Sequence, residues 1–117
     1  APNETELKPS AGEYLAPLKR YLKEPDMYRV LLTMHTDNTG SDSYRDQLTL
    51  DRVESVFNWF EDSNADTRYL FDYAMSDDIP LEPNTSIDSR RKNRRLEVYL
   101  VPGKRMLEQA KKGRIAF

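Results

Sequence analysis

Alternating apolar and polar positions predict that residues 27–35 form a β-strand in the middle of a sheet. Val30, Leu32 and Met34 fall on one face of this strand, and the opposite face carries a further apolar residue, Leu31. Apolar side chains on both faces are typical of a central strand that helices cover on at least one side. We therefore expect this segment to be the centre of the sheet.

Two later segments show the same two-residue period and predict further strands. In residues 68–73, the aromatic residues Tyr69, Phe71 and Tyr73 occupy every second position. In residues 96–101, aliphatic residues occupy every second position from Leu96 to Leu100. The simplest interpretation of the aromatic set is that it belongs to the core.

Apolar residues at helical spacing predict a helix before the first strand. Leu15, Leu22 and the apolar residues between them recur at intervals of three and four. Ser10 and Glu13 have the spacing of a capping box, which predicts that the helix starts at Ser10. Pro17 lies inside the pattern, so it either kinks the helix or marks its first turn.

A longer helix is predicted after a turn at residues 37–40, with Ser41 or Ser43 as its N-terminal cap. The Asn and Gly of this turn tolerate left-handed backbone. Arg52 falls beside the apolar arc of the helix and not under it. The arc, roughly 100° wide or somewhat more, comprises Leu50, Val53, Val56, Phe57 and Phe60.

The remaining segments complete the domain. Residues 74–86 are irregular and longer than an ordinary connection, and long loops in small domains are more often functional than accidental. Short helices are predicted at 86–93 and at 104–112. The domain assignment is residues 1–103, including an N-terminal arm at 1–9, followed by an appended helix and tail at 104–117.

Composition limits the classes of function. The 117 residues, 38% hydrophobic and 32% charged, suffice for one core and not for two. A formal charge of −2 gives no large field to attract nucleic acid or an anionic membrane. The chain has no cysteine and therefore no thiolate site. No apolar run reaches the roughly 20 residues of a membrane span, so we expect any tether to a membrane to lie outside this chain.

Asp37 and Arg52 are the sharpest candidates for binding. An acid just past a strand and a base on the following helix converge above the sheet's edge, where open α/β folds bind ligands. They could hold the ammonium and the carboxylate of a zwitterion, the latter with two parallel N–H bonds. They could equally form an intramolecular ion pair that pins the turn to the helix.

Three separated blocks of the sequence resemble the OmpA-like peptidoglycan-binding domain. The motif of that family runs G-H-T-D-x-x-G, then N-x-x-L-S-x-x-R-A-x-x-V, then G-R-x-N-R-R-V. This chain has H-T-D-N-T-G from His35, L-T-L-D-R-V from Leu48 and S-R-R-K-N-R-R-L from Ser89. The blocks come in the same order and with the same spacing, except that the third has one more residue between Arg90 and Asn93 than the motif has. The resemblance covers roughly residues 7–102.

The resemblance implies an α+β fold of the βαβαβ type, with a mixed sheet and helices on one face. It implies non-enzymatic binding of peptidoglycan through the diaminopimelate of the stem peptide, without cofactor or metal, in the periplasm at the outer membrane of a Gram-negative bacterium. By position, Asp37 matches the ligand-binding acid, Arg52 the ligand-binding arginine and Arg90 the arginine of the G-R block near the same pocket. Thr36 and Asn38 flank the acid and are expected to add backbone contacts.

The chain departs from the family pattern at several positions. Arg45 stands where the family has a ligand-contacting Asn, so it either binds a further carboxylate of the stem peptide or swings out and widens the pocket. Met34 and Ser89 replace family glycines. The family's strand before the first helix has no counterpart, since residues 1–9 resemble the family's segment after that strand. The place of that strand in the sheet is either empty or filled by another segment.

Other functions have less support in the sequence. Residues 37–48 resemble a calcium loop, but their glycine is fourth rather than sixth and their twelfth position lacks the bidentate Glu. In the basic cluster 90–95 we expect Arg94 and Arg95 to form stabilising ion pairs, not to bind nucleic acid. His35 is expected to be structural, and no nucleophile elbow accompanies it. The alternative to cell-wall binding is a protein interaction or adhesion module on the same fold.

Overall fold

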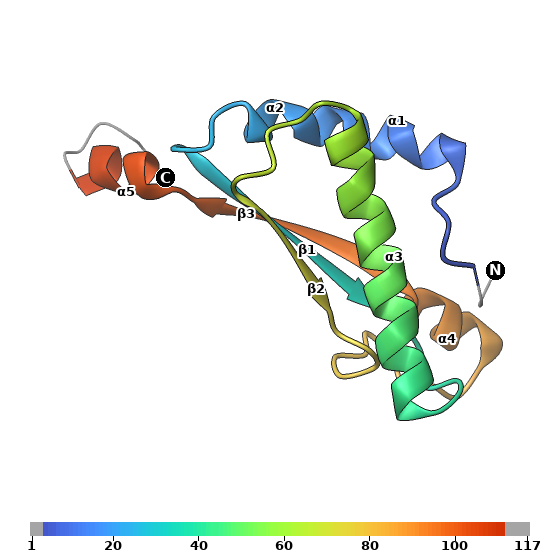
Figure 1. The fold of residues 1–117 in the computed structure, drawn as a ribbon. Helices are drawn as coiled ribbons and strands as arrows, with labels where there is room; N and C mark the ends of the chain where they lie inside the picture. Colours follow the sequence, from blue (N-terminus) through green and yellow to red (C-terminus); the bar gives the residue numbers. More distant parts are fainter. Residues whose placement is uncertain (1–3, 112–117) are drawn as a thin grey trace.

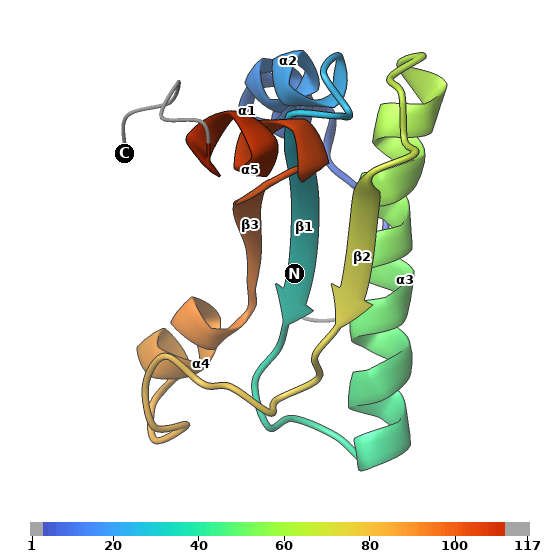
Figure 2. The same cartoon turned by 90° about the vertical axis from the view of Figure 1, so that its left-hand side faces the viewer.

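The computed structural model describes residues 4–111, which form a three-stranded sheet with helices packed against one face (Figures 1 and 2). Strand β1 (Tyr28–His35) lies between β2 (Leu70–Ala74) and β3 (Arg95–Pro102). β1 pairs with β2 in parallel and with β3 in antiparallel orientation. The predictions of a central first strand and of a mixed α+β sheet are therefore confirmed.

The helices occupy the segments that the sequence predicts. Before β1 come α1 (Gly12–Leu15) and α2 (Lys19–Leu22), preceded by 3₁₀ turns at Pro9–Ala11 and Ala16–Leu18. Helix α3 (Asp42–Asp62) connects β1 to β2, α4 (Ile87–Asn93) precedes β3, and α5 (Lys104–Lys111) follows it. Residue 112, the predicted end of the last helix, lies outside the described residues. None of these helices is both long and apolar enough to cross a membrane.

The start of the first helical segment differs from the prediction. It begins with the 3₁₀ turn at Pro9, and its N-cap residue, Lys8, makes no side-chain capping bond. Ser10 lies inside the turn, so the predicted capping box with Glu13 is wrong. The reason is that proline has a fixed φ suited to the first helical position, which puts Pro9 there and moves the N-cap from Ser10 to Lys8. Pro17 lies in the second 3₁₀ turn, which interrupts the α-helical segment.

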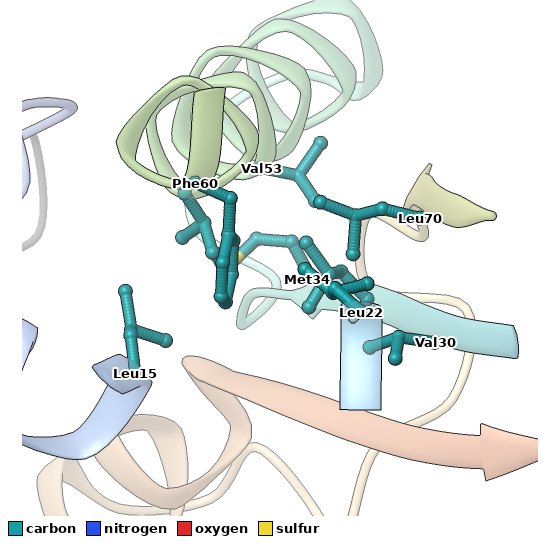
Figure 3. Packing of buried hydrophobic residues seen from close by; sticks show 9 residues of the cluster. Leu15, Leu22, Val30, Met34, Val53, Phe60 and Leu70 are labelled. Atoms are coloured by element: carbon teal, nitrogen blue, oxygen red, sulfur yellow. The ribbon is translucent and has the colours of Figure 1, made fainter. Parts of the chain in front are cut away.

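The core lies between the sheet and the helices on a single face. β1 contributes Val30, Leu32 and Met34 to it, as the alternation predicts, and all three are buried. Figure 3 shows α3 and the α1–α2 segment meeting over this face. The helices and β2 contribute Leu15, Leu22, Val53, Val56, Phe60 and Leu70 to this hydrophobic cluster.

The buried side of α3 is rotated from the predicted arc. Leu50 is 40% exposed, whereas its neighbour Thr49 is fully buried. Thr49 can occupy this position because its hydroxyl donates to the carbonyl of Arg45 at 3.0 Å, within the helix itself. The prediction that Leu50 belongs to the core is therefore wrong.

The other face of the sheet carries the aromatic residues of β2. Phe71 and Tyr73 are 37% and 47% exposed, and in the sheet register Phe71 lies beside Leu31. Leu70 is the buried residue of β2, because α3 packs on its side of this edge strand. The prediction that the aromatic set belongs to the core is wrong, since alternation alone does not say which face is covered.

The outer edge of β3 has no neighbouring strand within residues 4–111. Leu100, on the helix-facing side of β3, is 44% exposed as a result. Among the described residues, the sheet therefore consists of these three strands, and no other segment takes the place of a further strand.

We expect Phe60→Ala and Leu50→Ala to have very different effects on stability. Phe60 is fully buried, so its truncation should lower the free energy of unfolding by about 3 to 5 kcal/mol. Leu50→Ala, on the same helix, should cost less than about 1 kcal/mol because the side chain is already largely solvated. Urea denaturation of both variants measures the difference, and equal losses would show that the helix face is assigned wrongly.

Candidate functional site

Two buried polar residues, Thr36 and Asp37, follow the end of β1. The Thr36 amide donates to the carbonyl of Ser76 at 2.9 Å, so the segment after β2 holds the end of β1. Asp37 is 2% exposed, and its two oxygens accept from different elements. Oδ1 accepts from the Thr39 amide at 2.8 Å, which closes a tight turn, and Oδ2 accepts from Nη1 of Arg94 at 2.5 Å.

Asp37 stays ionised at neutral pH. Burial by itself raises the pKa of its carboxyl, but the hydrogen bonds from Thr39 and the Arg94 guanidinium outweigh burial, and the pKa lies below its ordinary value. A buried carboxylate is therefore held charged by a cation that is 21% exposed. The end of β1 therefore carries a negative charge, the Asp37 carboxylate, which the guanidinium of Arg94 partly neutralises.

Helix α4 places Arg94 at this position. Ser86 and Ser89 form a reciprocal capping box, in which each side chain accepts from the other's amide at 3.0 Å. Asn93 is fully buried, and its side-chain oxygen accepts from the amides of Leu81 and Glu82. Both ends of the short helix are thus fixed to the preceding loop. Ser89, where the family has glycine, has a defined role in the cap.

Arg52 lies on α3 under the N-terminal arm. Its Nε donates to the carbonyl of Glu4 at 2.7 Å, and the Ser55 hydroxyl, three residues on, donates to the carbonyl of Thr5 at 2.7 Å. Burial lowers the pKa of the Arg52 guanidinium, against opposing attraction from Tyr44 and Asp37. An arginine remains charged under such a shift, so the arm covers part of a cationic group.

Residues of this arm line three hollows. One of about 330 Å³ is lined by the arm together with Tyr14, Met34, Arg52 and Val56. A second of about 300 Å³ extends it toward β3 and is lined by both Arg52 and Arg94. The third, of about 420 Å³, lies over the turn and the first half of α3; its lining is Thr5, Thr39, Gly40, Tyr44, Gln47, Leu48 and Asp51.

Asp37 has a different ion-pair partner from the one that the sequence offered as the alternative to ligand binding, Arg52. The ion pair that the structure gives Asp37 is with Arg94, 57 residues away in sequence. Arg52 is near enough for its charge to interact with Asp37, and it lines two hollows. The expectation that Arg94 forms a stabilising ion pair is confirmed.

The other candidates lie around this centre. Asn38 is exposed, and its carbonyl accepts from Arg45 at 3.2 Å. Arg45 points at the turn and does not line any of the three hollows. Arg90, on α4, has a buried Nε with no hydrogen-bond partner within residues 4–111, and it too is absent from the lining of these hollows. The structure therefore groups Asp37 with Arg52 but leaves Arg45 and Arg90 beside them.

His35 belongs to the outer face of the sheet. It is 2% exposed, and its Nε2 lies 2.9 Å from the hydroxyl of Thr33 and 3.6 Å from Glu97. Burial and the charge of Arg95 lower its pKa, outweighing the opposite effect of Glu97. Arg95 forms an ion pair with Glu97 at 2.9 Å, as expected. Within the described residues, no cluster of three or more acids and histidines could hold a metal.

Sequence reasoning missed two parts of the site. It did not identify Arg94 as the partner of Asp37, although Asn93, Arg94 and Arg95 belong to the third motif block. It also treated residues 1–9 as an arm without a role, whereas Glu4 and Thr5 contact α3 and line hollows. No spacing in the sequence signals the arm contact, because Arg52 and Ser55 bind main-chain carbonyls, which every residue carries.

Comparison with known proteins points to one family. The model of the OmpA family matches residues 1–94. The outer-membrane lipoprotein YfiB of Pseudomonas aeruginosa is 28% identical over 94 residues, which are 80% of this chain and 56% of the relative. The chain thus spans little more than half the length of that curated relative.

Two solved structures show the same fold. The peptidoglycan-associated lipoprotein from Burkholderia pseudomallei is 18% identical with a TM-score of 0.77, covering 85% of this chain and 84% of the other. A putative MotB-like protein from Desulfovibrio vulgaris is 26% identical with a TM-score of 0.75, covering 87% of this chain and 68% of the other. These similarities agree with the mixed sheet and helix placement described above.

We expect Asp37 to make stability depend on pH. Its folded pKa is depressed, so its contribution is fully present above the unfolded value of about 3.9 and is lost as pH falls through the lower folded value. Asp37→Asn should therefore lose less stability than the parent between neutral and strongly acidic pH. Urea denaturation at a series of pH values measures both slopes, and parallel curves would contradict the described environment.

Proposed function

The chain belongs to the OmpA family, and on that premise we propose that it binds peptidoglycan non-covalently through the diaminopimelate of the stem peptide. The domain would anchor a tethered partner or the outer membrane to the wall, within the periplasm, without a catalytic step. The observation that carries the proposal is that Arg52 lines two adjoining hollows with the ionised Asp37 nearby. A cation that lines a hollow, with an anion close enough to interact with it, suits a zwitterionic side chain.

Arg52 would take the side-chain carboxylate of diaminopimelate. A guanidinium presents two parallel N–H groups to a carboxylate, and charge-assisted bonds of this kind contribute about 1.5 to 3 kcal/mol. Tyr14, Met34 and Val56 line the adjoining hollow and offer apolar walls to the methylene chain of the ligand. A small number of such contacts gives weak single-site affinity after ordering costs.

Asp37 would take the ammonium. Each of its oxygens accepts one described hydrogen bond and retains further acceptor capacity, so an ammonium can bind without displacing Thr39 or Arg94. Because Asp37 is 2% exposed, the ammonium can reach it only if the groups packed around the carboxylate move. Thr36, Asn38, Arg45 and Arg90 are proposed as surrounding residues of the same site.

The names of the relatives support this proposal. One relative is an outer-membrane lipoprotein and another is called peptidoglycan-associated. Weak affinity is sufficient for an anchor of this kind, because the wall is a polymer with many sites and tethering raises the effective concentration. The names of these relatives also support a location of this chain in the cell envelope.

Arg52→Ala should weaken binding to a diaminopimelate-containing stem peptide by about 10-fold to 100-fold, because the carboxylate loses its charge-assisted bonds. Arg68→Ala is the matched control, since Arg68 is exposed and pairs with Asp66 in the loop before β2. Isothermal titration calorimetry gives the affinities. Unfolding curves establish that both variants remain folded.

A lysine-containing stem peptide should bind the parent protein more weakly than the diaminopimelate form, because lysine lacks the second carboxylate that Arg52 would bind. The loss should match that of Arg52→Ala. Equal affinity for the two peptides would refute the role of Arg52. Absence of binding to purified sacculi would favour the interaction-module alternative instead.

A further inference from the structure

We infer that Arg45 is a positioning residue that locks the Asp37–Gly40 turn and ties it to the loop after β2. The sequence predicts that this arginine either binds a further carboxylate of the stem peptide or swings out and widens the pocket. The structure shows a third role. The effect on ligand binding rests on the proposed function. The set of contacts by which Arg45 holds the turn, called the clamp below, is a property of the free protein.

The guanidinium holds the turn by its main chain. Nη1 of Arg45 donates to the carbonyls of Asn38, at 3.2 Å, and Gly40. The Asn38 carbonyl belongs to the same rigid peptide plane as the Thr39 amide, which donates to Asp37 Oδ1. Fixing the carbonyl therefore fixes the direction of the N–H group that orients the carboxylate.

The same turn forms one wall of the hollow of about 420 Å³, which Thr39, Gly40 and Tyr44 line. Gly40 has a φ of +83°, and a Cβ added there would lie 2.5 Å from the Tyr44 ring. A turn with left-handed backbone packed this closely has few alternative conformations that keep the wall in place. By holding this turn, Arg45 thus fixes the shape of the hollow and also the orientation of the Asp37 carboxylate.

Arg45 also connects two loops. Its Nε forms an ion-pair contact of 3.1 Å, without hydrogen-bond geometry, with a carboxylate oxygen of Asp77 in the segment after β2. Its Nη2 contacts Asp42. That segment is already joined to the end of β1 through the bond from the Thr36 amide to Ser76. The clamp therefore closes a link from the turn, through Asp77, back to β1.

The charge of Arg45 is compensated within the protein. Two acids face the guanidinium, which is 12% exposed. A cation in the first turn of a helix meets the unfavourable end of the helix dipole, so these acids also offset that repulsion. A ligand carboxylate would have to compete with both of them. We therefore infer that Arg45 positions the turn and does not contact the ligand directly.

The test compares Arg45→Asn, Asp77→Asn and the double variant with the control Arg68→Asn. In the free protein, amide hydrogen exchange of Thr39 reports the bond to Asp37. Both single variants should speed exchange at Thr39, the double variant should add little, and the control should change nothing. Affinity for the diaminopimelate-containing stem peptide should fall by about 3-fold to 10-fold in each single variant, through lost pre-organisation.

Several outcomes would overturn the inference. Unchanged exchange at Thr39 in Arg45→Asn would show that there is no clamp. Tighter binding by Asp77→Asn, together with weaker binding by Arg45→Asn, would show that Arg45 contacts the ligand directly and that Asp77 competes for it. If the parent protein binds no peptide, the proposed function fails, and the exchange measurement still decides whether the clamp exists.

Discussion

The ion pair between Asp37 and Arg94 is the interaction on which the site depends. It joins the end of the central strand to the residue between α4 and β3, across 57 positions of sequence. A buried charge is costly unless it is paired and hydrogen-bonded, and Asp37 meets both conditions through Arg94 and Thr39. The loop before α4 has to be anchored for this geometry to exist, which explains why Asn93 is buried and bonded to Leu81 and Glu82.

A network of small polar groups supports the same end of the sheet. The Thr36 amide donates to the Ser76 carbonyl, and the Ser76 amide in turn donates to the buried hydroxyl of Thr49, at 3.3 Å, on α3. Ser76 has a positive φ of 52°, so the chain turns sharply at the point where these bonds form. The ends of β1 and β2 are thereby fixed to the helix between them. This rigid base lets charged groups near it keep a defined separation.

Arg52 and Arg45 lie on the same helix but have different surroundings. They are seven residues apart on α3, yet Arg45 faces the turn and its acids, whereas Arg52 faces the hollows beside the N-terminal arm. Each of these two opposite charges has a described partner of its own, Arg94 for Asp37 and the arm carbonyl of Glu4 for Arg52. A ligand that carries both charges is complementary to such a pair.

Local patterns in the sequence determined the order of strands and helices and the central position of β1, and they narrowed the cap of α3 to Ser41 or Ser43, of which the structure uses Ser41. Alternation and capping depend on near neighbours, so the sequence is enough to predict them. The sequence also brought Asp37 and Arg52 together as candidates, since a strand end and the next helix converge, and in the structure their charges interact. Tertiary structure decided which face was covered, and so exposed Phe71 and buried Thr49. It also decided that Arg94 pairs with Asp37 and that Arg45 turns to Asp77, because charge partners depend on proximity in space and not on spacing in sequence.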